Sequence, residues 1–113
     1  MSDDFYGTLS ICLPGIRPRL EALTDKKCPH KTASVFADYT KRLGEAGDLN
    51  GVKKCFRLAE ELMKDSSDAI KLAIEANYIF SVTQCRVFYS SLLPLLPELL
   101  KEKYQQQVKA GGI

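Results

Sequence analysis

The sequence predicts an all-α fold in which residues 1–113 form a single compact bundle of five to six helices. Apolar residues recur every three or four positions through most of the chain, which is the spacing of amphipathic helices. Residues 49–64 have one charged face, and residues 69–82 are apolar almost all round. The composition, 45% apolar and 27% charged over 113 residues, is that of one globular domain with a sizeable core.

The N-terminal part predicts two short helices separated by a proline break. Residues 3–13 carry apolar side chains at four-residue steps. Pro14 and the glycine after it interrupt this pattern, which resumes over residues 16–23. Pro18 then falls in the first turn of the second helix, where a missing N–H does little harm. We expect a loop over residues 24–27.

Residues 29–46 predict a longer helix, with Pro29 in its first turn. The apolar stripe is Val35, Phe36, Tyr39, Leu43 and Ala46, and the polar side is Asp38, Lys41, Arg42 and Glu45. Gly47 fits the left-handed position that ends many helices. Asp48 or Asn50 would cap the next helix, because a short side-chain oxygen accepts from free N–H groups of the first turn.

The next two segments predict a helical pair. Residues 49–64 gather their charged side chains within about 120° of the helix wheel. Residues 65–68 break the pattern, and residues 69–82 should form a nearly buried central helix. The only strip expected to face water there is Asp68, Lys71 and Glu75. Asn77 lies off that strip, so we expect it to be at least half-buried and to need hydrogen-bond partners. Segments 29–46 and 49–64 are predicted to flank this helix as antiparallel neighbours.

The C-terminal part, like the N-terminal part, is predicted to contain helices interrupted by prolines. We expect these segments to close the bundle at both ends. Residues 83–93 are predicted to continue as helix, with inward side chains at Val87, Phe88 and Leu92. Pro94 and Pro97 interrupt and restart it. The last helix should run to about Val108, and residues 110–113 should be a frayed tail.

The cysteines predict reduced thiols in a cytoplasmic protein. Cys12, Cys28, Cys55 and Cys85 have none of the short spacings of a zinc half-site. Residues 1–4 are acidic and polar, so we expect no secretory segment, and no apolar run is long enough to span a bilayer. Cys12, Cys55 and Cys85 have apolar surroundings and are expected to be buried.

No constellation in the sequence predicts catalysis. His30 is the only histidine, and the thiol of Cys28 two residues before it has no reason to converge on it in space. Glycines do not form a phosphate-binding loop, and acidic residues do not form a calcium loop. We therefore expect no enzyme activity, no metal and no cofactor.

Basic residues gather between positions 17 and 31, and we expect a partner to bind there and at Arg42. The candidate partner-binding residues are Arg17, Arg19, Lys27, His30, Lys31 and Arg42. The net charge is only +2, stacking aromatics do not interleave with these residues, and no helix has the character of a recognition helix. Nucleic-acid binding is therefore the least favoured function, and membrane binding is not expected.

Two classes of function remain. The first is a non-enzymatic helical protein-binding module of unknown partner, of the kind that immunity proteins and antitoxins represent. The second is a small-ligand-binding protein or an enzyme with a polar pocket in the bundle, built from buried groups such as Tyr39, Asn77 and Tyr78. A homodimer is compatible with either class.

The chain also resembles a family of small all-helical bacterial proteins of unknown function. The residues that carry the resemblance are Leu13-Pro14 with Arg17-Pro18 and Leu20, Val35 to Tyr39 with Leu43, Gly47 to Leu49, Cys55 to Leu62, and Leu93 to Leu100 with Tyr104. The resemblance implies a helical fold and no catalytic residues. The alternation of helices is loosely similar to that of HEAT-type helical repeats, at the level of fold alone.

Overall fold

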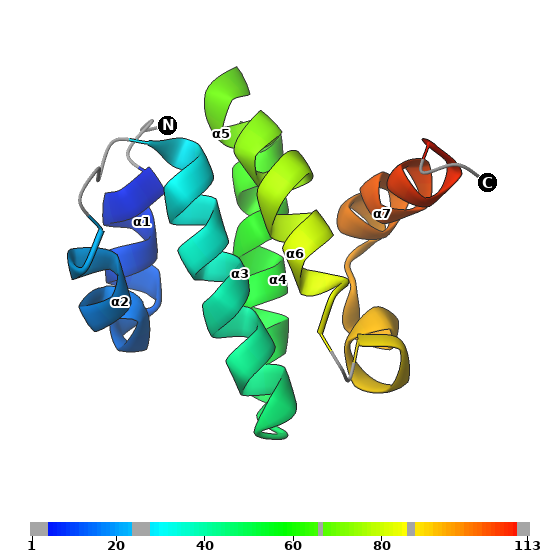
Figure 1. The fold of residues 1–113 in the computed structure, drawn as a ribbon, viewed down its shortest axis with the longest axis horizontal. Helices are drawn as coiled ribbons and strands as arrows, with labels where there is room; N and C mark the ends of the chain where they lie inside the picture. Colours follow the sequence, from blue (N-terminus) through cyan, green and yellow to red (C-terminus); the bar gives the residue numbers. More distant parts are fainter. Residues whose placement is uncertain (1–4, 24–27, 66, 86–87, 111–113) are drawn as a thin grey trace.

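Three packed rods form the middle of the protein in a computed structural model (Figure 1). They are α3 (Pro29–Glu45), α4 (Leu49–Asp65) and a third rod made of α5 (Asp68–Ala73), the π-helical turn η2 (Ile74–Ile79) and α6 (Phe80–Val82). The structure describes residues 5–23, 28–65, 67–85 and 88–110, and helix is the only regular structure within these ranges. The all-α prediction is therefore confirmed.

The turn between α3 and α4 is built as its sequence predicts. Gly47 has φ +81°, and its N–H donates to the carbonyl of Gly44 at 3.1 Å. The Asp48 N–H donates to the carbonyl of Leu43 at 2.9 Å, which completes a Schellman motif. The Oδ1 atom of Asp48 accepts from the N–H of Gly51 at 3.0 Å and so caps α4. Of the two predicted caps, Asp48 is thus the one used.

Substituting Gly47 with alanine should lower the free energy of unfolding by about 1 kcal/mol, because a Cβ is strained at positive φ. Gly47→Asn is the matched control, since asparagine tolerates the left-handed region better and should recover much of the loss. Urea denaturation of the three proteins measures the difference. An alanine variant as stable as the wild type would show that this turn does not require the left-handed conformation.

The rods do not run in the directions expected from the sequence. Each reverses the one before it, so α4 is antiparallel to both neighbours while α3 and α5–α6 run parallel (Figure 1). The cross-links between α3 and the third rod follow this order, since Thr40 pairs with Tyr78 and Lys41 approaches Cys85. The prediction that both flanking helices are antiparallel to residues 69–82 is wrong for residues 29–46, because two successive tight reversals restore the first direction.

The core-facing side of α3 is rotated from the predicted apolar stripe. Its buried residues are Thr32, Ala33, Phe36, Ala37, Thr40 and Gly44. Of the predicted stripe only Phe36 is buried, and Ala46 is exposed. Small residues take the core positions because neighbours come close: a Cβ on Gly44 would lie 2.9 Å from a methyl carbon of Leu92. Thr40 can be buried because its hydroxyl donates to the carbonyl of Phe36 at 2.9 Å.

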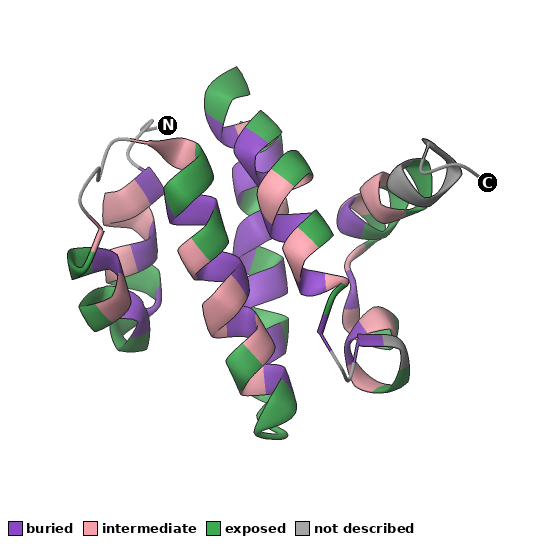
Figure 2. Ribbon diagram, viewed as in Figure 1, coloured by how far each residue is buried: buried purple, intermediate pink, exposed green. Residues whose placement is uncertain are grey.

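The third rod is less buried than predicted. Ile70, Ala73, Ile74, Tyr78, Ile79 and Val82 face the core. Leu72 and Phe80, however, are 56% and 58% exposed, and their spacing of three or four residues from the exposed Ala69 and Ala76 puts the four on one outer strip. Figure 2 shows exposed segments along α5 and α6. The prediction that only Asp68, Lys71 and Glu75 reach water is therefore wrong. The reason is that the N-terminal helices pack on the far side of α3 and leave this face uncovered (Figure 1).

The N-terminal part forms two short helices on either side of the proline break, as predicted. They are α1 (Phe5–Cys12), a 3-10 turn η1 (Pro14–Ile16) and α2 (Arg17–Glu21). Leu9, Ile16 and Leu20 are fully buried and hold this unit against α3. Cys12 is exposed at the end of α1, so its predicted burial is wrong, whereas the burial of Cys55 and Cys85 is confirmed. The predicted loop at 24–27 lies outside the described residues.

The C-terminal part closes the other side of the bundle. After α6 the chain turns through Thr83–Cys85 and does not continue as a regular α-helix. The N–H groups of Gln84 and Cys85 donate to the carbonyls three residues earlier, which tightens the chain into a turn. A π-helical turn η3 (Phe88–Leu92), a 3-10 turn η4 (Leu93–Leu95) and α7 (Glu98–Ala110) follow. Phe88 and Leu92 are buried as predicted. Val87 and residues 111–113 lie outside the described part of the chain.

The described helices make a compact body with a radius of gyration of 13.1 Å. This is close to the value expected for a globular chain of this length. Counting α5, η2 and α6 as one rod, the α-helices number six among the described residues, which agrees with the predicted five to six. None of the described helices combines the length and the apolar character that a membrane crossing requires.

Candidate functional site

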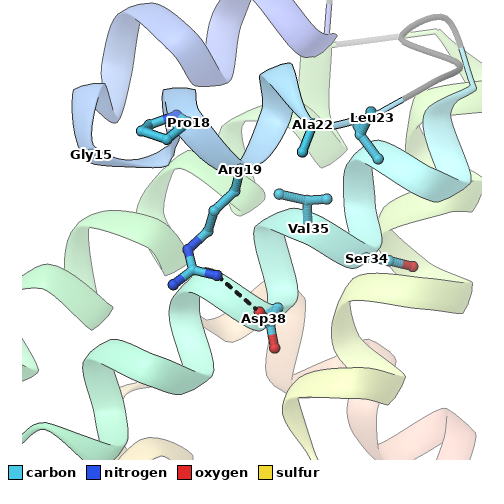
Figure 3. A pocket seen from close by; sticks show the side chains of 8 residues that line it. All are labelled: Gly15, Pro18, Arg19, Ala22, Leu23, Ser34, Val35 and Asp38. Carbon is cyan, nitrogen blue, oxygen red and sulfur yellow. Dashed lines mark ion pairs between the residues drawn. The ribbon is translucent and has the colours of Figure 1, made fainter.

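A concave feature lies between α2 and α3, and we call it the α2–α3 pocket (Figure 3). Its volume is about 840 Å³. It is lined by Gly15, Pro18, Arg19, Ala22, Leu23, Ser34, Val35 and Asp38. In Figure 3 the side chain of Val35 faces Ala22 and Leu23 across the pocket, and Arg19 reaches over to Asp38. The pocket therefore combines an apolar wall with one pair of opposite charges.

The local sequence explains why α2 stands where it does. Ile16 and Leu20 are fully buried, so one side of this short helix is fixed to the core. Gly15 allows the chain to approach α3 closely, because a Cβ there would lie 2.7 Å from the hydroxyl oxygen of Tyr39. Pro18 stands in the first turn of α2 and adds apolar surface to the pocket. The exposed side of α2 is thus held a fixed distance from α3.

Two arginines converge on one carboxylate at the edge of the pocket. The Nε atom of Arg42 donates to Oδ2 of Asp38 at 3.1 Å, one helical turn away on α3. A terminal nitrogen of Arg19 lies 3.6 Å from the same Oδ2 atom. Both ion pairs are partly exposed, so they contribute little to the stability of the fold. Their main effect is to hold charged side chains at the edge of the pocket.

Of the predicted partner-binding residues, the structure brings only Arg19 and Arg42 together among those it describes. Arg19 and Arg42 meet at Asp38, as described. Arg17 is turned away, since its Nε atom donates to the carbonyl of Ser10 at 2.9 Å. Lys31 is exposed on α3. Lys27 lies outside the described residues.

His30 joins the third rod instead of the α2–α3 pocket. Its Nδ1 atom and the Oδ1 atom of Asn77 are 2.5 Å apart, which pairs the two residues across α3 and η2. Asn77 is half-buried, so its expected need for a hydrogen-bond partner is confirmed.

A buried polar cluster links Thr40, Cys55 and Tyr78 in the core. The hydroxyl oxygens of Thr40 and Tyr78 are 2.9 Å apart. Burial raises the pKa of Tyr78 well above 10, and the nearby Cys55 acts in the same direction, while the bond to Thr40 opposes the shift. Burial likewise raises the pKa of Cys55 to about 11. Both groups therefore stay neutral near pH 7, and the thiol is unsuited to nucleophilic chemistry.

Sequence reasoning missed most of the pocket wall. The sequence pattern predicts Asp38 on the solvated side of its helix and Val35 in the core-facing stripe. Leu23 meets Ser34 and Val35 only because α2 packs back on α3, so no local pattern identifies this wall. Within the described ranges no three metal-ligating side chains of histidine, cysteine, aspartate or glutamate lie close enough to hold an ion.

Comparison with family models gives a match to a domain of unknown function (DUF7674) over residues 6–110. The chain belongs to the DUF7674 family. The match spans every described helix except the first residue of α1, so the family corresponds to the whole bundle, α2–α3 pocket included. This agrees with the resemblance to an all-helical family of unknown function. No curated protein and no solved structure matched the DUF7674 chain.

Proposed function

We propose that the protein is a non-enzymatic helical protein-binding module whose partner docks at the α2–α3 pocket. The observation that carries the proposal is an open pocket of about 840 Å³ that pairs apolar side chains with a partly exposed arginine. Apolar anchors beside arginine are typical of the centres of protein interfaces. Arg19 and Arg42 supply the charge, and Val35 with Leu23 supplies the apolar surface.

The finer form of the proposal is an immunity or antitoxin-like protein that covers its partner in a bacterial cytoplasm. Its small size and its mixed-charge helix faces favour this form. Four free cysteines are consistent with a reducing compartment. A toxin-like open reading frame next to the gene in its native host would support this form, and a partner that is not a toxin would argue against it.

The alternative is a small-ligand-binding protein or an enzyme with a polar pocket. The pocket volume falls in the range of small-ligand sites. Of the polar groups expected to build such a site, however, Tyr78 bonds Thr40 and Asn77 pairs with His30. Tyr39 is not among the lining residues of the α2–α3 pocket. Neither Tyr78 nor Asn77 lines the α2–α3 pocket. We therefore favour a protein partner.

A homodimer remains an expectation that is compatible with the proposal. The outer strip with Leu72 and Phe80 is the apolar surface that a second copy could cover. Sedimentation equilibrium of the wild type and of Phe80→Ser measures this directly. A monomer in both would remove the homodimer.

The test of the proposed function is to block the pocket in the full-length protein. Ser34→Trp places a large ring at the pocket wall, and Glu61→Trp places the same ring at an exposed position on α4. Tagged forms are used to capture partners from the native host, after thermal melting has shown that both variants fold. We expect a protein that the wild type and Glu61→Trp retain and that Ser34→Trp loses. Equal capture by all three, or capture of nothing, would contradict the proposal.

A further inference from the structure

We infer that the α2–α3 pocket recognises an acidic peptide segment of its partner, with one carboxylate on Arg19 and a neighbouring aliphatic side chain against Val35 and Leu23. This inference rests on the proposed function and names the chemistry of the partner. Three features of the pocket support it: the hydrogen-bonding state of Arg19, the local charge and the shape of the apolar wall.

The guanidinium group of Arg19 has N–H donors that a ligand can use. Its closest approach to Asp38 is 3.6 Å, which is longer than a hydrogen bond, and the same Oδ2 atom already accepts from Arg42 at 3.1 Å. Among the described residues the Arg19 guanidinium therefore has an ion pair with Asp38 and donates no side-chain hydrogen bond. That group presents five N–H donors in a planar fork, which suits a carboxylate that accepts two parallel bonds.

The local charge favours an acid. Two guanidinium groups face one carboxylate at the edge of the pocket, which leaves one positive charge uncompensated. Lys31 is exposed on α3 one turn before Ser34 and Val35 and adds a second cation to this side. Glu21 is exposed on α2 but does not line the pocket. An incoming carboxylate would restore the balance, whereas a basic segment would meet repulsion.

The apolar wall points to a polypeptide. Ala22 and Leu23 on α2 face Val35 on α3 across the pocket, and Arg19 and Asp38 lie beside this apolar part. An aliphatic side chain could therefore contact Val35 while a carboxylate one helical turn away reaches Arg19. The pocket is open to solvent, so a segment that continues beyond it is not obstructed. An acidic residue near an aliphatic residue in one short segment satisfies all these features.

The experiment uses three libraries of displayed peptides that share a fixed leucine and differ in one fixed residue three positions away. That residue is glutamate, glutamine or lysine. The full-length wild-type protein should enrich the glutamate library. For an enriched peptide, Arg19→Gln should raise the Kd at least about tenfold, because it removes a charge-assisted hydrogen-bonded pair. The matched control Arg57→Gln, on α4 and outside the α2–α3 pocket, should leave the Kd unchanged.

Other outcomes separate this inference from the proposed function. Equal enrichment of the glutamine and glutamate libraries would overturn carboxylate recognition, while docking at the pocket would stand. If no library is enriched but a partner is captured that Ser34→Trp loses, recognition of a linear peptide segment would be overturned. Docking of a protein at the pocket would then still stand. Binding of octanoate that Arg19→Gln abolishes, with no library enriched and no partner captured, would overturn both in favour of a small carboxylic acid.

Discussion

Replacing Phe36 with alanine should lower the free energy of unfolding by roughly 3–5 kcal/mol. Phe36 is fully buried on α3. Its ring stacks on Tyr78 with centroids 4.2 Å apart and meets the edge of Phe5 at 6.3 Å. The substitution would therefore remove buried surface and leave a cavity where α1, α3 and the third rod meet. Because domains are stable by only about 5–15 kcal/mol, a large part of the stability would be lost.

The control for this prediction is an identical substitution on the surface. Phe80 is 58% exposed, so Phe80→Ala should cost about 1 kcal/mol or less. Urea denaturation followed by circular dichroism measures both variants. If Phe36→Ala does not unfold at lower temperature or denaturant concentration than Phe80→Ala, the three-ring cluster does not hold the bundle together.

The second prediction is a loss of stability in alkaline solution. Burial raises the pKa of Cys55 from 9.0 to about 11 and the pKa of Tyr78 well above 10. In the unfolded chain these groups lose their protons near their ordinary pKa values, while in the fold they keep them. Their contribution is thus fully present below about pH 9 and is lost as pH rises through the higher folded pKa values. The slope approaches about 1.4 kcal/mol per pH unit for each group.

The measurement is the free energy of unfolding at several pH values between 8 and 11, under reducing conditions. Tyr78→Phe should flatten the decline above pH 10, and Cys55→Ala should flatten it between pH 9 and 11. Comparing slopes separates titration from the packing changes that each substitution also causes. Cys12 is exposed, so Cys12→Ala serves as the control and should keep the wild-type slope. A wild-type profile that is flat to pH 11 would contradict the assigned burial.

The sequence predicted where helices begin and end better than it predicted which helix faces are buried. Gly47, Asp48 and Pro29 act through their own backbone and nearest neighbours, so the sequence located the turn and both helix starts. The exposure of Leu72 and Phe80 was not predictable in this way, because it depends on where α1 and α2 pack. The buried side of α3 was also misjudged, since Thr40 and Gly44 are core residues without large apolar side chains.

The candidate site was predictable in part for the same reason. Arg19 and Arg42 were identified because basic residues are visible as such in a sequence. Their shared contact with Asp38 joins α2 to α3 across nineteen sequence positions and follows from tertiary packing alone. The wall formed by Leu23 and Val35 arises from the same packing. The charged residues of the site could therefore be predicted from the sequence, whereas the pocket that they line could not.

The π-helical turn at Ile74–Ile79 has a consequence for how this family can vary in length. A π turn holds one more residue per turn than the α-helix around it. Loss of one residue within this turn would let the rod relax to a regular α-helix, and the faces of the segments before and after it would be kept. The same deletion inside α3 would rotate every later side chain by about 100° and displace Phe36 or Thr40 from the core. Single-residue gaps between relatives should therefore concentrate at this turn.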